Sequence, residues 1–325
     1  MSAGLAPAAP APEDGEPTGR LARVWTLARR PLIVLFFLGV AALLVSQARQ
    51  IDWAEVSQAL RRLPTFTLAA ALALAAVSYL TYTSYDLLGR AWTRHTLPRR
   101  QTLGVAFISY AFNLNLGALV GGMAFRLRLY TRLGLSQART LKVLALSMTT
   151  NWLGYAALAG ALLLADVVRL PARWSMGPLA LQLLGAALIS VVLAYGLACA
   201  FSRRRSFTVR GHTLELPSAR LAGLQLLLSM GNWLLMGLLV HVLLQQRLPW
   251  AEVQGALLMA AVAGVVTHVP AGLGVLEAVF IALLGRQLPH GEILAALLAY
   301  RVIYYLAPLG LATAWHLRLE AQARR

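Results

Sequence analysis

Long apolar runs recur along the whole chain, and they limit what it can fold into. Of its 325 residues, 59% are hydrophobic and 13% are charged, which is too apolar and too charge-poor for an ordinary soluble domain. Each run is long enough to cross a hydrocarbon core of ~30 Å as a helix. The sequence therefore predicts an all-α, polytopic membrane protein with six full spans, near residues 31–47, 65–86, 143–165, 178–201, 221–246 and 293–316.

Two further apolar stretches, 101–125 and 253–285, contain glycine and proline interruptions. Unpaired backbone in hydrocarbon costs several kcal/mol per group, so a broken helix must be buried in protein or border a polar cavity. A glycine-rich packing seam between helices is the competing interpretation. Asn113, Asn115 and Pro270 favour real breaks. We therefore expect two re-entrant or broken hairpins, with the breaks among Asn113, Asn115, Gly117, Gly121 and Gly122, and at Pro270, Gly272 and Gly274.

The basic residues support the hairpins. If 101–125 crossed fully, the dense basic run from Arg126 to Lys142 would lie opposite the basic 87–100 loop, against the positive-inside rule. With two hairpins, 21 of the 29 basic residues are cytoplasmic, seven are outside, and Arg301 lies within the last span. Both termini are then expected in the cytoplasm. The net charge of +17 is explained by orientation and by anionic headgroups, and no nucleic-acid partner is expected.

The order of full span, broken hairpin and full span occurs twice, at about 65–165 and about 221–316, and the copies run in opposite directions. Gly121 and Gly134 are separated by the same thirteen positions as Gly272 and Gly285. This pattern predicts an inverted repeat, with a site near the midplane where the repeats meet. Residues 1–19 are expected to be a disordered tail, 20–325 a single transmembrane domain and 51–60 an amphipathic interfacial helix.

Ionisable residues at membrane depth are costly, so each is a candidate for function. Arg126 and Glu277 each lie five residues after a matched glycine. A bidentate guanidinium suits phosphate oxygens, so Arg126 is the first candidate ligand for a lipid headgroup. Glu277 is expected either to act directly or to form a buried ion pair with Arg301 or Arg126. The six candidates are Asp86, Arg126, His241, His268, Glu277 and Arg301.

Aromatic residues surround one of these candidates. Tyr300, Tyr304 and Tyr305 are helical neighbours of Arg301, which is compatible with a headgroup pocket or with an aromatic interface belt. His268 is expected to titrate or contact a ligand, or to satisfy freed backbone groups. Zinc-helix, P-loop and nucleophile-elbow motifs are absent, and Cys199 is the only cysteine. No catalytic residue, cofactor or metal site is expected.

Several motifs together resemble YbhN-type bacterial inner-membrane proteins, a group similar to the transmembrane region of the lysylphosphatidylglycerol synthetase and flippase MprF. The resemblance covers nearly the whole chain after residue 20. It is carried by Ser109-Tyr-Ala-Phe-Asn-Leu-Asn115, Val120-Gly-Gly-Met-Ala-Phe-Arg126 with Tyr130, Thr149-Thr-Asn-Trp-Leu-Gly-Tyr155, Thr267-His-Val-Pro-Ala-Gly-Leu-Gly-Val-Leu-Glu277 with its continuation to Phe280, and Ala299-Tyr-Arg-Val-Ile-Tyr-Tyr305.

The resemblance implies a lipid-handling domain of the bacterial inner membrane. In MprF the transferase chemistry belongs to a separate soluble domain, which this sequence lacks, so we expect a flippase-like translocase and not an aminoacyltransferase. Its expected substrate is an anionic or aminoacylated phospholipid or a polyprenyl lipid. A lipid-modifying enzyme and a non-transporting scaffold are the alternatives. Membrane phospholipids are the expected partners, and a second copy of the chain or an envelope lipid-transport protein is the expected protein partner.

In this hypothesis each candidate residue has a role at the lipid site. Arg126 and Arg301 hold the anionic headgroup, while Glu277 and His268 tune the site. The remaining lipid-binding candidates are Asn113, Asn115, Tyr130 and Tyr304.

Overall fold

The computed structural model describes residues 53–117, 122–168, 170, 177–203, 206–209 and 212–322, all of which belong to one compact unit, residues 51–325. The predicted tail at 1–19, the predicted span at 31–47 and Gly121 lie outside the described residues.

The described chain is almost entirely helical, as predicted. Its elements in chain order are α2 (Trp53–Arg61), α3 (Thr65–Thr93), α4 (Arg99–Leu116), α5 (Phe125–Arg132), α6 (Gln137–Leu164), α7 (Pro178–Phe201), β1 (Ser206–Val209), β2 (His212–Glu215), α8 (Ala219–Leu243), α9 (Trp250–Thr267), η2 (Pro270–Gly272), α10 (Val275–Leu284), α11 (His290–Tyr300), η3 (Arg301–Leu306) and α12 (Ala307–Gln322).

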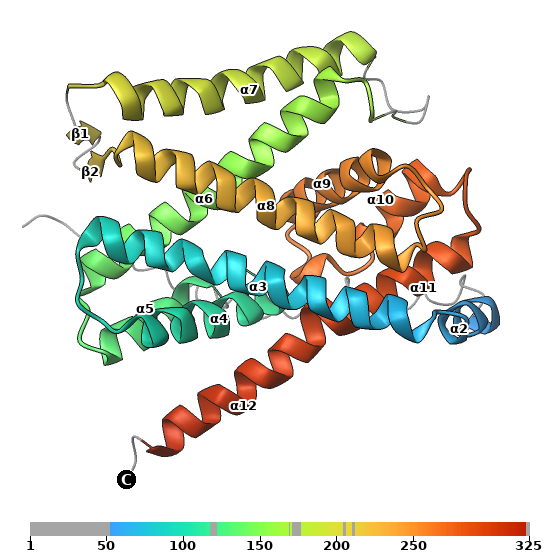
Figure 1. The fold of residues 1–325 in the computed structure, drawn as a ribbon, viewed down its shortest axis with the longest axis horizontal. Coiled ribbons are helices and arrows are strands. Elements are labelled where there is room, and N and C mark those ends of the chain that lie inside the picture. Colours follow the sequence, from blue (N-terminus) through green and yellow to red (C-terminus); the bar gives the residue numbers. More distant parts are fainter. Residues whose placement is uncertain are drawn as a thin grey trace, which may run out of the picture. The chain divides into compact units, whose positions relative to one another are not determined.

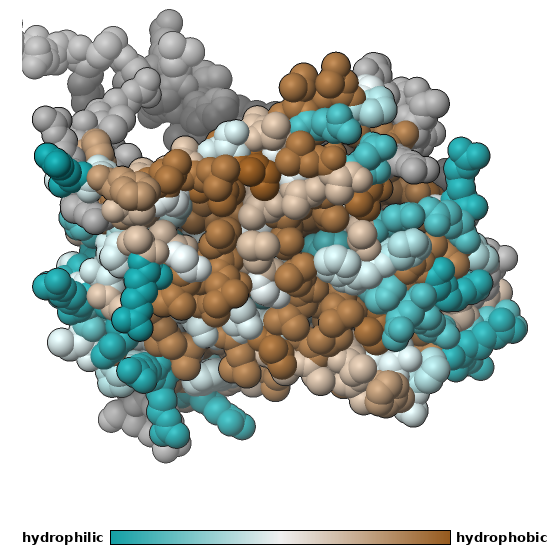
Figure 2. Space-filling view, turned by 45° about the horizontal axis from the view of Figure 1, so that its top comes forward, coloured by the Kyte–Doolittle hydropathy of each residue, from teal (hydrophilic) through white to brown (hydrophobic). Residues whose placement is uncertain are grey.

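Five helices of the described chain are long and apolar enough to cross a membrane: α3, α7, α8, α9 and the continuous helix from His290 to Ala321. The 28-residue helix α6 is also long enough and packs against α3, α7 and α8. Figure 2 shows the expected surface for such a bundle, because an apolar band crosses the visible face between hydrophilic ends. Four of the predicted spans correspond to α3, α6, α7 and α8, and the fifth to α11, η3 and α12 together.

The two interrupted stretches fold back on themselves. Hairpin 1 consists of α4, residues 117–124 and α5, and hairpin 2 consists of α9, residues 268–274 and α10. In each hairpin the two arms are in contact. The first arms both contain 18 residues, and the second arms contain 8 and 10. A proline directly precedes each first arm, Pro98 before α4 and Pro249 before α9, where its missing N–H costs no helical hydrogen bond.

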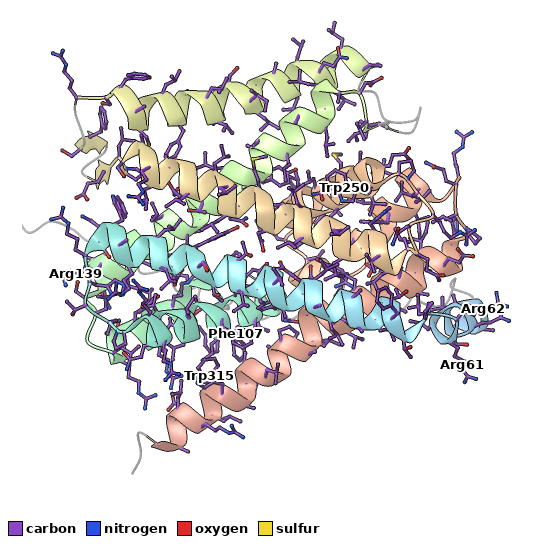
Figure 3. All side chains as sticks on the ribbon, viewed as in Figure 1. Arg61, Arg62, Phe107, Arg139, Trp250 and Trp315 are labelled. Atoms are coloured by element: carbon purple, nitrogen blue, oxygen red, sulfur yellow. The ribbon has the colours of Figure 1, made fainter. Side chains whose placement is uncertain are left out.

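The hairpins open toward opposite ends of the bundle. We call these the Arg139 end and the Arg62 end, after residues labelled in Figure 3. Hairpin 1 begins and finishes at the Arg139 end, and hairpin 2 does so at the Arg62 end (Figure 1). The spans α3 and α8, which precede the two hairpins, run antiparallel and pack against each other. The arrangement is that of the predicted inverted repeat.

Three local features add detail to the predictions. Of the alternatives for the first break, the structure has Gly117, where φ is 83°, whereas Asn113 and Asn115 are helical residues near the end of α4. The last span is interrupted by a π-helical segment, η3, which the sequence pattern did not suggest. A short antiparallel hairpin of β1 and β2 connects α7 to α8. The expected amphipathic helix at 51–60 is present as α2, which docks Val56 against Leu294 and Ala295 of α11.

The charge asymmetry predicts that the Arg139 end is cytoplasmic, and cysteine labelling tests this prediction. With Cys199 replaced by alanine, Ser136→Cys is expected to react with an impermeant thiol reagent only when the cytoplasmic side is accessible, because Ser136 lies between hairpin 1 and α6. Gln246→Cys, after α8, is expected to react only from the opposite side. Labelling of both positions from one side would contradict the hairpin topology.

Candidate functional site

The tip of hairpin 1 is a close crossing of its two arms. The backbone N–H of Gly117 donates to the carbonyl of Asn113 at 2.9 Å and ends α4. A Cβ atom on Gly122 would lie only 2.7 Å from Asn113 Oδ1, so only glycine lets the returning chain pass over this side chain. Asn113 and Asn115 remain half-buried at this tip.

The tip of hairpin 2 has a more contorted backbone. Four of the seven residues from 268 to 274 have positive φ: His268, Ala271, Gly272 and Gly274. This region is unfavourable for residues with a Cβ atom, so the two non-glycine residues must be stabilised by the structure around them. Because these turns leave carbonyl groups without helical partners, the tip needs donors from elsewhere.

Arg301 supplies those donors. Its guanidinium donates to the carbonyls of Ala271 at 3.0 Å and Gly272 at 2.9 Å. Nε and Nη2 also donate to the two carboxylate oxygens of Glu277 at 2.6 and 3.0 Å. Four of the five N–H groups of Arg301 are therefore used within the protein. Of the two ion pairs considered for Glu277, the structure has the one with Arg301.

The environment of this pair explains its geometry. Glu277 lies in the first turn of α10, where the helix dipole favours a negative charge. Arg301 begins the π-segment η3 and is also 5.6 Å from the ring of Tyr305. Only 10% of the Arg301 side chain and 15% of the Glu277 side chain are exposed. The pair thus fixes the break of hairpin 2 to the following span.

Arg126 makes the corresponding connection in hairpin 1. Its Nη2 lies 3.0 Å from Asp86 Oδ1, and the two side chains are only 3% and 0% exposed. The Tyr130 hydroxyl donates to Asp86 Oδ2 at 2.8 Å. Since Arg126 and Tyr130 belong to α5 and Asp86 belongs to α3, this cluster fixes hairpin 1 to the preceding span. The alternative pair of Arg126 with Glu277 is not formed.

Tyr304 joins the two repeats at the centre of the bundle. Its hydroxyl is 2.7 Å from Ser78 Oγ of α3 and 3.0 Å from the hydroxyl of Tyr110 of α4. Ser78 in turn donates to Asn232 Oδ1 of α8 at 2.7 Å. Tyr304 is fully buried, so these hydroxyl and amide groups satisfy one another where water is excluded.

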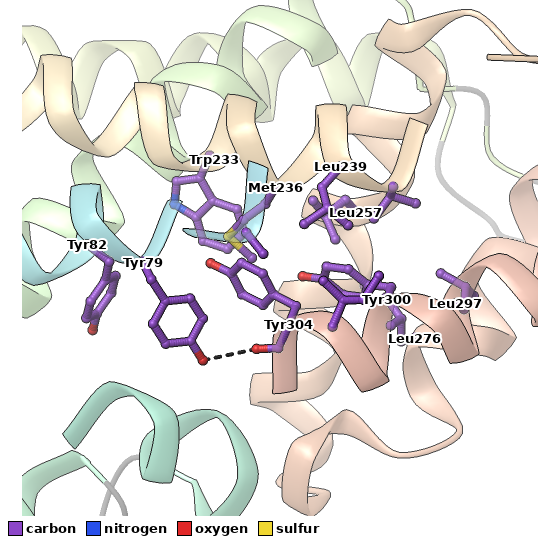
Figure 4. Packing of buried hydrophobic residues seen from close by; sticks show 14 of the residues in the cluster. Tyr79, Tyr82, Trp233, Met236, Leu239, Leu257, Leu276, Leu297, Tyr300 and Tyr304 are labelled. Carbon is purple, nitrogen blue, oxygen red and sulfur yellow. Dashed lines mark hydrogen bonds between the residues drawn. The ribbon is translucent and has the colours of Figure 1, made fainter. Parts of the chain in front are cut away.

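The Tyr304 backbone explains the π-segment. The residue four positions later, Pro308, has no N–H to donate to the Tyr304 carbonyl. The hydroxyl of Tyr79 donates to that carbonyl at 3.0 Å instead (Figure 4). One residue later, the Tyr305 carbonyl accepts a hydrogen bond of 3.2 Å from Asn115 Nδ2 at the tip of hairpin 1. The first repeat therefore supplies donors to the broken helix of the second.

The candidate residues thus fall into two groups. The first comprises buried residues that fasten the hairpins, namely Arg126, Tyr130, Glu277, Arg301 and Tyr304. The second comprises residues with more exposure at the tips, namely Asn113, Asn115 and His268. The tips adjoin, because α4 contacts η2. His241 is half-buried in the last turn of α8 and is not part of this arrangement.

Several hydrogen-bond and ion-pair partners of the candidate residues were not predicted from the sequence. Asp86 was singled out only as a buried charge, and its pairing with α5 was not predicted. Tyr79, Ser78 and Asn232 have no charge to mark them, although the spacing of Ser78, Tyr79, Tyr82 and Tyr85 along α3 was visible. Pro308 could have indicated the π-segment from the sequence, because a proline in the interior of a helix removes a helical hydrogen bond.

Comparison with known proteins gives three matches. Residues 32–312 match the sequence profile of the family described as lysylphosphatidylglycerol synthase TM region. The chain belongs to this family. A relative named "Inner membrane protein YbhN", from Escherichia coli strain K12, is 47% identical over 302 residues, which cover 93% of this chain and 95% of the relative. An uncharacterized protein of Synechocystis sp. is 32% identical over 282 residues, covering 86% and 87%.

The resemblance noted from the motifs is thereby confirmed, and the chain is a membrane protein. The part that matches the lysylphosphatidylglycerol synthase TM region family contains both hairpins and both ion pairs. The matched region is the transmembrane part of such synthases.

Breaking the Asp86 pair is expected to destabilise the bundle strongly. Asp86→Asn leaves the Arg126 charge buried without a counterion, and such changes cost about 3–5 kcal/mol. Lys142→Ala removes the pair with Glu215, whose side chains are 43% and 42% exposed, and is expected to cost less than about 1 kcal/mol. Thermal unfolding in detergent compares the two. A similar loss in both variants would contradict the fastening role of Asp86.

His95 adds a pH dependence at the base of hairpin 1. It lies between α3 and α4, is 3% exposed, and has its ring 6.1 Å from that of Tyr130. Burial lowers the pKa of His95 below its ordinary value, nearby Arg90 and Arg139 lower it further, and Asp86 opposes them. The folded state therefore favours neutral imidazole, whereas the unfolded chain takes up a proton near pH 6.5.

Because the unfolded state binds more protons, stability is expected to fall as the pH drops below about 6.5. The melting temperature in detergent should decrease from pH 7.5 to 5.5, and His95→Gln should make that decrease smaller. His290→Gln, which changes an exposed histidine at the Arg62 end, is the control. An unchanged pH dependence in His95→Gln would exclude this residue as its source.

Proposed function

We propose that this protein moves an anionic or aminoacylated phospholipid, or a polyprenyl lipid, between the leaflets of the bacterial inner membrane. The observation that carries the proposal is the meeting of two oppositely directed hairpins, whose tips adjoin inside the bundle. Each hairpin is fastened to a full span by a buried ion pair. A rigid membrane anchor would not need broken helices, which cost backbone hydrogen bonds.

An inverted repeat suits exchange between leaflets. Its two halves have the same construction but face opposite sides, so one half can open inward by the motion that opens the other outward. Such a motion would have to preserve or exchange two contacts, which are the Asp86–Arg126 and Glu277–Arg301 ion pairs. Because a buried charge without a partner is costly, these pairs limit the hairpins to a few discrete positions.

The structure changes the roles that we propose for the candidate residues. Arg301 has used four of its five donors, so its main role is to hold hairpin 2. The Arg126 side chain is only 3% exposed, so it reaches a headgroup only if hairpin 1 moves. Asn113, Asn115 and His268 are more exposed at the adjoining tips, and we assign them the direct contacts with the headgroup.

The relatives support the proposed lipid substrate and the proposed location in the inner membrane. The family description names a synthase of lysylphosphatidylglycerol, an aminoacylated phospholipid, and the Escherichia coli relative is named an inner membrane protein. The matched region is the transmembrane part, which favours lipid movement over aminoacyl transfer.

Reconstitution tests the proposal. Purified protein in phosphatidylcholine vesicles with a fluorescent phosphatidylglycerol is expected to make the inner-leaflet probe accessible to a membrane-impermeant quencher faster than in protein-free vesicles. Glu277→Gln weakens the attachment of hairpin 2 and is expected to reduce the exchange at least about tenfold, since a charge-assisted bond contributes about 1.5–3 kcal/mol.

Glu292→Gln is the control, because this exposed glutamate is in the first turn of α11 and pairs with Arg247 at the Arg62 end. It is expected to exchange lipid at the wild-type rate. The mass of the probe is measured in parallel. Exchange equal to that in protein-free vesicles for phosphatidylglycerol, lysylphosphatidylglycerol and polyprenyl phosphate would refute the proposal, and a changed lipid mass would indicate an enzyme instead.

A further inference from the structure

A groove separate from the hairpin tips runs between α4 and α12. Its volume is about 570 Å³. Figure 3 shows two of its aromatic residues, Phe107 on α4 and Trp315 on α12, on the facing sides of these helices. It is lined by Phe107, Leu311, Ala314, Trp315, Arg318 and Leu319. The last four lie beyond the part of the chain that matches the family, which ends at residue 312.

The groove is shaped by one close contact. A Cβ atom on Gly104 would lie 3.1 Å from Trp315 Cζ2, so the missing side chain lets the indole lie against α4. The ring centroids of Phe107 and Trp315 are 5.9 Å apart. Leu311 remains 66% exposed and Trp315 43% exposed. The result is a largely apolar groove that is bordered by two aromatic rings and open to the surface.

One end of the groove is positively charged. Arg318 lines it directly, three residues after Trp315 on α12. Arg100 lies four residues before Gly104 and seven before Phe107, and so on the same face of α4. Since α4 begins and α12 finishes at the Arg139 end, both arginines belong to that end of the groove.

The neighbouring charges leave Arg318 available. Glu320 accepts hydrogen bonds from Arg128 at 2.9 Å and Arg132 at 2.7 Å, both on α5. Within the part of the chain that the structure describes, Arg318 is exposed and has no ion-pair partner. An apolar groove that ends at an arginine without a counterion is complementary to a molecule with an acyl chain and an anionic headgroup.

We propose that this groove binds one anionic phospholipid. An acyl chain lies along Leu311, Ala314 and Phe107, and the headgroup phosphate meets Arg318, with Arg100 adding to the positive potential. Trp315 precedes Arg318 by three residues, and tryptophan is enriched at the interface between apolar chains and headgroups. This site gives the proposed translocation a preference for anionic lipid. Binding is measured separately from exchange, so either proposal can fail alone.

Photocrosslinking tests the site. Wild-type protein is reconstituted in nanodiscs of phosphatidylcholine that contain a trace of phosphatidylglycerol with a photoreactive group in its acyl chain. The expected crosslinks lie on residues 311–319. Unlabelled phosphatidylglycerol should compete and phosphatidylcholine should not, and higher ionic strength should weaken the capture because it screens the headgroup attraction.

Two variants and two matched controls make the test specific. Arg318→Gln is expected to reduce capture about fivefold, the effect of losing one basic residue near the surface, whereas Arg139→Gln, at the same end but away from the groove, leaves it unchanged. Ala314→Trp should fill the groove and abolish capture. Ala187→Trp on the exposed face of α7 adds the same bulk elsewhere and should have no effect.

Three results would overturn the proposal. Equal labelling by phosphatidylcholine and phosphatidylglycerol probes would show ordinary contact with surrounding lipid. Capture unaffected by both Arg318→Gln and Ala314→Trp would place the lipid elsewhere. A photoreactive residue at position 314 that crosslinks to residues 31–47 would show that a segment of the same chain fills the groove.

Discussion

The structure depends on one constraint, which is that every backbone polar group within the membrane needs a partner from the protein. Two hairpins and a π-segment break the helical hydrogen-bond pattern, at residue 117, at residues 268–274 and at residues 301–306. At the second and third of these breaks, side chains replace the missing backbone partners. Arg301 donates to two carbonyls of hairpin 2, and Tyr79 and Asn115 donate to two carbonyls of the last span. These two breaks are tolerated because each lies against donors of another element.

The positions of the charged residues follow from this constraint and from the free-energy cost of burying a charge. A guanidinium can serve several carbonyls at once, but its charge must be neutralised when it is buried. Glu277 neutralises Arg301, and Asp86 neutralises Arg126. In both cases the acid and the base come from different helices, one in the returning arm of a hairpin and one in a full span. Each ion pair therefore has two effects. It offsets the free-energy cost of burying a charge, and it fixes the position of a hairpin.

The sequence predicted the architecture well, because apolar runs, glycine breaks and arginine asymmetry are each direct consequences of the membrane. It predicted both hairpins, their opposite directions and the pairing of Glu277 with Arg301 as one of two alternatives. For the first break it left several positions open, from Asn113 to Gly122, and the structure has the break at Gly117. Asn113 and Asn115 remain helical, and the side chain of Asn115 donates to the Ala111 carbonyl within α4.

The parts that the sequence did not predict depend on contacts between distant residues. Asp86 and Arg126 are 40 positions apart, and Ser78 and Tyr304 are 226 apart. No periodicity links such positions, so the pairing of Arg126 with Asp86 was not predicted. The groove at Trp315 was missed for the same reason, because Gly104 has no feature in sequence that pairs it with an indole in the last helix.

The two halves of the repeat are fastened unequally, although their construction is the same. Hairpin 2 is held by four hydrogen bonds from one arginine, two of them to the backbone of the break itself. Hairpin 1 is held through α5 by one ion pair and the Tyr130 hydroxyl, and through α4 by the hydrogen bonds that join Asn115 to Tyr305 and Tyr110 to Tyr304. Arg126 does not contact the carbonyls of the described tip residues. Moving hairpin 2 therefore requires its backbone turns to lose donors at the same time as its carboxylate, whereas the tip of hairpin 1 loses the hydrogen bond of Asn115 while Asp86 keeps its partners. From this difference in attachment, we expect the tip of hairpin 1 to move more readily than the tip of hairpin 2.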